Sequence, residues 1–170
     1  ISVKQKIFIS YARNDKEKVL SFTSLIDDSQ YETWIDEKGI SYGELYTSKI
    51  FDNIKQSDVF IVFLSESSVQ SRWVKEEIDF AIKEKIEYGK IAILPIILEK
   101  CNLPALISHM DYLDAISSID YALKEFKGKF GEISKTKNKI RQNNSKYDIS
   151  IMLPSIQSQI GRAVQQECRD

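Results

Sequence analysis

The chain has 170 residues, a net charge of −1 and a hydrophobic content of 42%. This composition excludes a disordered, fibrous or membrane-spanning protein, and the length allows one substantial core with an appendage. The longest apolar run, Ile91–Leu98, contains Pro95 and is only long enough for a strand.

The first part of the chain predicts a strand, a helix and a second strand. Lys6–Ser10 is a short apolar strand, after which Asn14 or Asp15 can cap a helix that runs to about Asp28. The apolar positions of this helix repeat with helical spacing: Val19, Phe22 and Ile26, with Leu25 beside them. Tyr31–Asp36 alternates apolar and polar residues, which predicts the second strand.

A polar loop, DEKGISYGELY, follows the second strand and contains Gly39 and Gly43. Backbone freedom alone is enough to explain these two glycines. The next apolar residues have helical spacing, so we expect a helix with Ile50, Phe51 and Ile54 facing inward.

The stretch from Ser57 to Ile86 organises the rest of the chain. Val59–Leu64 is an unbroken apolar run rich in β-branched and aromatic residues, which predicts a strand buried on both faces. A serine-rich turn, Ser65–Ser71, ends this strand, and Ser71 can cap the helix that follows. The inward stripe of that helix comprises Val74, Ile78, Ala81, Ile82 and Lys85, the last through its aliphatic stem.

Trp73 and Glu77 stand four residues apart near the start of this helix, so their side chains point the same way. The pattern places an indole ring beside a carboxylate at the cleft above the strand ends. Spacing alone favours a more ordinary interpretation, in which Trp73 covers the core and Glu77 is a solvated helix residue.

Two more strands and a helix complete the folded part. Lys90–Leu98 predicts a fourth strand, and Pro95 indicates that its far end lacks a full ladder of hydrogen bonds. Asp111–Ala115 predicts a short fifth strand, and Ser117 to about Phe130 a closing helix. The inward positions of this helix are Ile119, Leu123 and Phe126.

Strands separated by helices of this length predict right-handed crossovers and a parallel sheet covered on both sides. We therefore expect an α/β fold, a flavodoxin-like three-layer sandwich with a five-stranded parallel sheet of order 2-1-3-4-5. In such folds the site lies above the carboxyl ends of the strands. Polar residues converge there from three strands: Ser10, Tyr11 and Arg13, then Asp36 and the glycine loop, then Ser65–Ser71.

The end of the chain differs in composition, so we expect a folded domain over 1–131, a basic linker over 132–148 and an amphipathic helix, or the start of a downstream domain, over 149–170. Between Lys124 and Lys146 eight basic residues face two acidic ones, a local charge of +6 that leaves −7 on the remainder. Because few aromatics interleave with these charges, a solvated connector is favoured over a nucleic-acid or membrane contact.

The single histidine, His109, lies in a loop-like segment and is interpreted as a surface residue, because a Ser-His-Asp device would need two matched partners. Cys101 and Cys168 are far apart and have no metal-type spacing, so we expect no metal site and a reduced compartment. The chain begins at Ile1 without a signal-peptide pattern, and we expect a cytoplasmic location and a fragment of a longer protein.

Three segments carry a family resemblance: KIFISYARND, YETWID with its glycine loop, and VFIVFLSESSVQSRWVKEEI. In this order and spacing they resemble the TIR (Toll/interleukin-1 receptor) domain over residues 4–130, with the glycine loop as its BB loop. Other uses of such a fold are disfavoured. No G-x-G-x-x-G follows the first strand, and the third ends in Leu64-Ser65 where a phosphoacceptor domain requires aspartate.

The resemblance implies a set of site residues. In catalytically active members, the glutamate four residues after the helix tryptophan is essential for splitting NAD⁺ at the nicotinamide–ribose bond, and that spacing corresponds to Glu77, not Glu76. Trp73 would face the nucleotide. The resemblance also assigns further nucleotide contacts to Ser10, Tyr11, Arg13, Trp34 and Asp36, and BB-loop assembly contacts to Gly39, Ile40 and Gly43.

Three of these residues have an equally simple structural interpretation. Arg13 could pair with acids of the closing loop, Trp34 could belong to the core, and Asp36 could cap the BB loop through an Asx turn.

Two functions stay open at this point. The first is an NAD⁺ glycohydrolase or cyclase that releases nicotinamide and gives ADP-ribose or a cyclic isomer, in prokaryotic antiviral defence signalling. NAD⁺ is then the substrate and no cofactor is expected, and the partners are other TIR domains and a downstream sensor domain or effector protein. The second is a non-catalytic adaptor that only binds other TIR domains.

Overall fold

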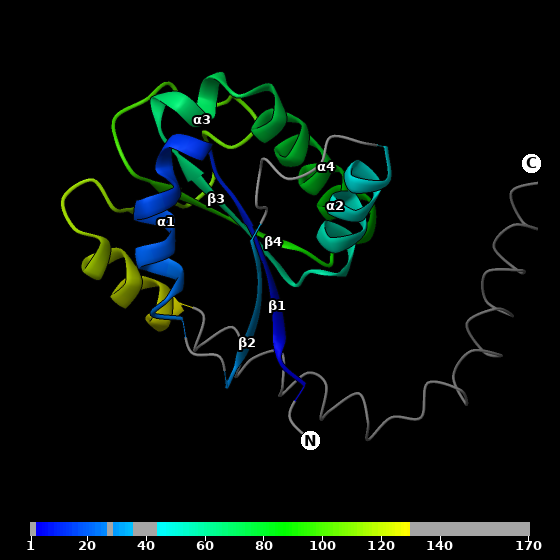
Figure 1. The fold of residues 1–170 in the computed structure, drawn as a ribbon, viewed down its shortest axis with the longest axis horizontal. Helices are drawn as coiled ribbons and strands as arrows, with labels where there is room; N and C mark the ends of the chain where they lie inside the picture. Colours follow the sequence, from blue (N-terminus) through cyan, green and yellow to red (C-terminus); the bar gives the residue numbers. More distant parts are fainter. Residues whose placement is uncertain (1–2, 27–28, 36–43, 130–170) are drawn as a thin grey trace, which may run out of the picture. The chain divides into compact units, whose positions relative to one another are not determined.

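The structure, a computed structural model, describes residues 3–26, 29–35 and 44–129. Five parallel strands form one sheet in the order β2-β1-β3-β4-β5, as the sequence predicts (Figure 1). Their bounds are β1 Gln5–Ser10, β2 Tyr31–Ile35, β3 Val59–Leu64, β4 Ala92–Ile97 and β5 Leu113–Asp114. Because all strands run the same way, their carboxyl ends meet along one edge of the sheet.

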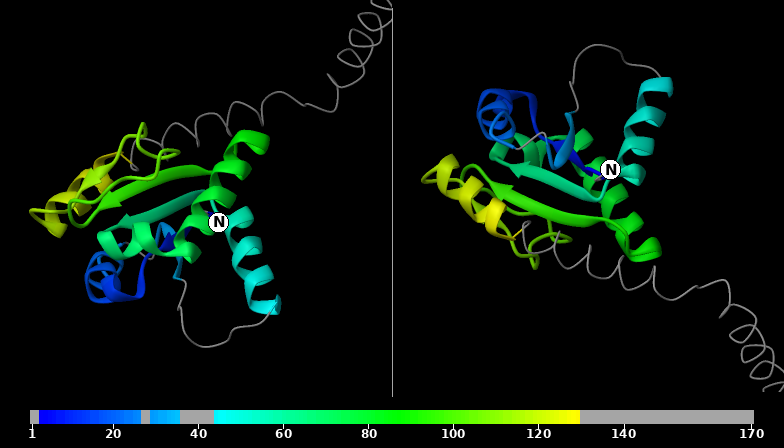
Figure 2. Two further views of the ribbon diagram at one scale, coloured as in Figure 1. Left: turned by 90° about the horizontal axis from the view of Figure 1, so that it is seen from above. Right: turned by 90° about the horizontal axis from the view of Figure 1, so that it is seen from below.

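Helices cover both faces of the sheet, which confirms the three-layer α/β sandwich. Helices α2 and α4 lie on one face, and α1 and the helical residues 119–126 lie on the other (Figures 1 and 2). The bounds are η1 Arg13–Asp15 (a 3₁₀ helix), α1 Lys16–Thr23, α2 Glu44–Gln56, α3 Glu66–Gln70 and α4 Arg72–Tyr88.

The core is centred on β3, because all six residues of this strand are buried. Its side chains alternate between the two layers. Phe60 stacks on Phe8 of β1 with ring centroids 5.6 Å apart, on the side of α2 and α4. Phe63 points the other way and contacts Phe22 of α1 edge to face at 5.4 Å. One strand thus holds both helical layers together.

Helix α1 is shorter than its periodicity predicts, because it ends at Thr23 instead of near Asp28. The hydroxyls of Ser21, Thr23 and Ser24 donate to backbone carbonyls of the preceding turn, and such local bonds compete with helix propagation. On α4, Lys85 is exposed, whereas Val74, Ile78 and Ala81 of the predicted stripe are buried.

The serine-rich segment after β3 is more ordered than the predicted turn, because it contains α3. The Ser65 hydroxyl accepts from the Ser68 N–H at 3.1 Å, and the Ser68 hydroxyl accepts from the Ser65 N–H at 2.7 Å. This reciprocal capping box fixes the start of α3. Ser71 then caps α4, as predicted, by accepting from the Val74 N–H at 3.3 Å.

Pro95 lies inside β4 opposite Val62, and β4 pairs with β3 along its whole length. The ladder is short on the other side of the strand, where β5 pairs with Ile96 and Ile97, both beyond Pro95.

Candidate active site

Ser10 and Glu77 form a buried, hydrogen-bonded pair at the carboxyl edge of the sheet. The Ser10 hydroxyl donates to Glu77 Oε2, and both side chains are fully buried. Ser10 ends β1, and because side chains alternate along a strand it faces the same layer as Phe8. Glu77 lies in the second turn of α4, on the buried face with Val74 and Ile78. The fold therefore joins two residues that are 67 positions apart.

Burial excludes the interpretation of Glu77 as a solvated helix residue. The neighbouring Glu76 has that character, because 42% of its side chain is exposed and it pairs with Arg72 at 3.1 Å on the helix surface. Removing an ionised carboxylate from water costs several kcal/mol unless hydrogen bonds compensate the loss. A buried acid with a dedicated donor, at the sheet edge where such folds bind ligands, is a functional candidate.

Aromatic rings extend across three strands on the same face of the sheet. Trp34 of β2 stacks on Phe8 of β1 with centroids 4.9 Å apart, and Phe8 in turn stacks on Phe60 of β3. Trp73, in the first turn of α4, is half-buried and packs against the same apolar cluster. Both tryptophans thus contact the core on the face that carries Ser10 and Glu77.

A second carboxylate–serine pair lies at this edge, and the sequence analysis missed it. Asp15, the last residue of η1, accepts a 2.5 Å hydrogen bond from the Ser65 hydroxyl. Asp15 occupies the N-cap position of α1, as predicted, but its side chain makes no capping bond to that helix. Burial raises the pKa of Asp15 above its ordinary value, the Ser65 hydrogen bond lowers it, and the nearby Glu99 carboxylate raises it further. The sequence feature that could have indicated this pair is Ser65, a serine directly after the buried strand β3.

Acidic groups surround this second pair. Glu99 Oε1 accepts from the Glu66 N–H at 2.8 Å at the start of α3. Burial, and next the charges of Glu66, Glu99 and Asp15, raise the pKa of the Cys101 thiol. His109 is exposed, as expected. Within residues 3–26, 29–35 and 44–129, no three His, Cys, Asp or Glu side chains are grouped to hold a metal ion.

Comparison with known proteins decides the family. A family model described as TIR domain matches residues 7–128, which is more than half of the chain and includes both carboxylate–serine pairs. The chain belongs to the TIR domain family. The resemblance found in the sequence is therefore confirmed.

Two curated relatives are similar over parts of their length. One, from Methanobrevibacter olleyae, is named "Probable 2' cyclic ADP-D-ribose synthase TcpO" and is 30% identical over 86 residues, 47% of this chain. The other, "NAD(+) hydrolase TcpC" from Escherichia coli, is 26% identical over 133 residues, 75% of this chain. The matches span 25% and 42% of these two relatives, so this TIR chain corresponds to only part of each.

A solved TIR structure has the same fold. The TIR domain of the Toll-related receptor TRR-2 from Hydra magnipapillata superimposes with a TM-score of 0.61 at 22% identity. The match covers 75% of this chain and 97% of the other. At this identity the likeness concerns the architecture.

The other residues expected at the TIR site have varied surroundings. Tyr11 is buried directly after β1, and Arg13 is exposed on η1. Asp36 and the BB-loop residues Gly39, Ile40 and Gly43 lie outside the described residues, and so does all of the linker and final helix expected over 132–170. Each helix in the described ranges is too short or too polar to cross a bilayer.

Proposed function

We propose that this TIR domain cleaves NAD⁺ at the nicotinamide–ribose bond, with Glu77 as the catalytic residue. The observation that carries the proposal is the buried Glu77 carboxylate, held by the Ser10 hydroxyl at the carboxyl edge of the sheet. The names of the two curated relatives support the same chemistry, because one is called an NAD(+) hydrolase and the other a cyclic ADP-ribose synthase.

The reaction suits a lone carboxylate. Breaking the N-glycosidic bond expels neutral nicotinamide from a cationic pyridinium, so the leaving group needs no strong acid. Positive charge develops on the ribose, as in the oxocarbenium-like transition states of glycosidases. A carboxylate hydrogen-bonded to the ribose hydroxyls stabilises that charge and orients the sugar. The Ser10 hydroxyl already donates to Glu77, and in the Michaelis complex a ribose hydroxyl would donate to the same carboxylate.

Trp73 is one helical turn before Glu77, and we assign it the stacking surface for the nicotinamide or ribose end of the substrate. Stacking on a nucleobase contributes roughly 1–3 kcal/mol in comparable contacts. Tyr11, Arg13, Trp34 and Asp36 are assigned supporting contacts. The substrate itself supplies the reactive bond, so the proposal includes no cofactor.

After nicotinamide leaves, the ribose carbon is attacked by water to give ADP-ribose, or by an atom of the same nucleotide to give a cyclic isomer. We propose that these products act in prokaryotic antiviral defence signalling, in the cytoplasm. Assembly through TIR–TIR contacts, with the BB-loop residues Gly39, Ile40 and Gly43 at the contact, is part of the proposal. So is a link to a downstream sensor domain or effector protein.

Nicotinamide release from NAD⁺ by the concentrated, assembled protein tests the proposal. We expect turnover by the wild type and a loss of roughly 10²–10³ in rate for Glu77→Gln, the effect of removing one charged stabilising group. Glu76→Gln is the matched control, because it changes an adjacent glutamate that is partly exposed. Absence of turnover by the wild type, even when assembled, would leave the adaptor function in its place.

A further inference from the structure

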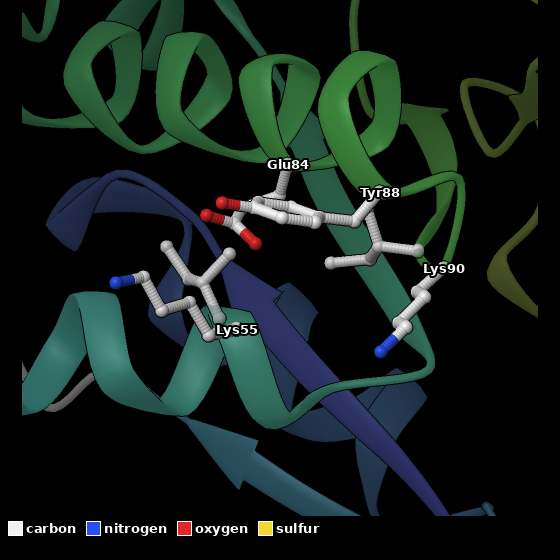
Figure 3. Close-up of a pocket in the computed structure, with 6 residues that line it drawn as sticks. Lys55, Glu84, Tyr88 and Lys90 are labelled. Carbon is white, nitrogen blue, oxygen red and sulfur yellow. The ribbon is translucent and has the colours of Figure 1, made fainter. Parts of the chain in front are cut away.

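A hollow lies at the opposite edge of the sheet from Ser10 and Glu77. It holds about 220 Å³ between the carboxyl-terminal turns of α2 and α4, near the amino-terminal ends of β3 and β4 (Figure 3). Its lining residues are Ile54, Lys55, Glu84, Tyr88, Lys90 and Ile91. Nothing in the NAD⁺ chemistry proposed above uses these side chains.

The hollow combines an apolar floor with an aromatic wall. Ile54 and Ile91 are almost fully buried, whereas 60% of Tyr88 is exposed, so its ring is available to a ligand. Gly89 ends α4 with a φ of 63°, a left-handed conformation that suits glycine, and its N–H bonds to the Lys85 carbonyl at 2.9 Å. This turn brings Lys90 back to the same hollow that Tyr88 lines (Figure 3).

Three charged side chains complete the lining. Lys55 lines the hollow from α2 with its ammonium pointing away from Lys90, Glu84 lies on α4 beside Tyr88, and Lys90 comes from the loop before β4 (Figure 3). The Lys55 ammonium also lies 5.8 Å from the centroid of the Phe80 ring, which keeps its stem along the cleft between the two helices. Two ammonium groups against one carboxylate favour a ligand that carries negative charge.

We propose that this hollow binds a nucleoside monophosphate whose base carries an amino group. The base stacks on Tyr88 above the floor of Ile54 and Ile91, and its amino group donates to the Glu84 carboxylate. The phosphate lies within the field of Lys55 and Lys90. At about 220 Å³ the hollow is smaller than the roughly 300–1,000 Å³ of pockets that enclose a whole drug-sized ligand, so it takes the base of one mononucleotide and excludes a dinucleotide.

Calorimetric titration of the full chain with adenosine 5′-monophosphate tests this proposal. We expect saturable binding, weakened about tenfold by Tyr88→Ala through loss of stacking and by Lys90→Gln through loss of a charged hydrogen bond. Glu84→Gln should reduce the preference for adenosine over uridine monophosphate, since uracil has no amino group. Tyr121→Ala and Lys100→Gln are matched controls, because Tyr121 is 58% exposed and Lys100 is also an exposed lysine, both outside the hollow.

Three outcomes would overturn the proposal. The first is equal affinity in wild type, Tyr88→Ala and Lys90→Gln. The second is equally tight binding of inorganic phosphate, which would indicate an anion site without base recognition. The third is loss of binding in Trp73→Ala alone, which would place the nucleotide at the active site. NAD⁺ turnover is measured separately, and we expect Tyr88→Ala to leave it unchanged, so the two proposals can fail independently.

Discussion

The two buried carboxylate–serine pairs at the carboxyl edge use the same chemistry for different purposes. Ser65 donates to Asp15 while its hydroxyl also accepts from the Ser68 N–H, so this pair ties η1 to the cap of α3. Ser10 ends a strand and begins no helix, and its hydroxyl donates to Glu77 on α4. The Asp15 pair is thus part of the secondary structure around it, whereas the Glu77 carboxylate lies at the carboxyl edge of the sheet with a donor that has no capping role.

The carboxyl and amino edges of the sheet also differ in how their charged side chains are exposed. Two carboxylates at the carboxyl edge, Asp15 and Glu77, are buried in pairs with serines, while the hollow at the amino edge exposes Lys55 and Lys90 to solvent. A buried carboxylate acts on a specific bonded neighbour in a low dielectric, whereas exposed ammonium groups attract anions weakly and are screened by salt. We therefore expect chemistry at one edge and reversible binding at the other.

The largest expected effect is a loss of catalytic activity when Glu77, but not Asp15, is replaced. Glu77→Gln should lower the rate of nicotinamide release by roughly 10²–10³ and change the free energy of unfolding by less than about 1 kcal/mol. Asp15→Asn should retain most of the activity in the same assay, because its pair supports η1 and α3. Equal loss of turnover in both variants would end the distinction between a catalytic pair and a structural pair.

The second effect should appear in stability. Ser65→Ala removes both the cap of α3 and the donor to Asp15, so we expect a loss of about 2–3 kcal/mol in the free energy of unfolding. Urea denaturation followed by circular dichroism measures it. Ser67→Ala is the control, because Ser67 only accepts an exposed 3.1 Å bond from the Asn14 side chain and should cost less than about 0.5 kcal/mol.

A smaller effect is expected from Ser10→Ala, which leaves Glu77 buried without this donor. We expect a loss of about 1–2 kcal/mol in stability and a rate lower by about tenfold, because the carboxylate is then less firmly oriented. Thermal unfolding and nicotinamide release on the same samples report both quantities. A variant with wild-type turnover would show that substrate alone positions Glu77.

The smallest effect concerns pH. The pKa of Asp15 is raised in the folded state, chiefly by burial, so the folded protein holds this proton more tightly than the unfolded chain. The protonated Asp15 carboxyl therefore stabilises the folded protein fully below its ordinary pKa of 3.8, and this stabilisation is lost as the pH rises through the raised pKa. Asp15→Asn should therefore become more stable relative to wild type between about pH 4 and 7. Chemical denaturation across this range measures the difference, and a constant difference would contradict it.

Much of the fold was predictable because its signals are local. Apolar runs such as Val59–Leu64 and the helical spacing of Val74 and Ile78 identify strands and helices without knowledge of their partners. The errors arose where hydroxyl groups bond to the nearby backbone. Serine and threonine ended α1 at Thr23 and built the capping box of Ser65, and such bonds leave almost no periodic trace in the sequence.

The sequence by itself determined the main strands and helices and the spacing of Trp73 and Glu77, because alternation and helical periodicity act over a few residues. The strand order was predicted from the flavodoxin-like plan, and the family from the resemblance of three motif segments. Only the tertiary structure decided that Glu77 is buried against Ser10, that Asp15 pairs with Ser65, and that Tyr88 and Lys90 share a hollow with Lys55. These contacts join residues 67, 50 and more than 30 positions apart. They form only when the crossover helices pack on the sheet, since burial depends on which distant surface covers a side chain.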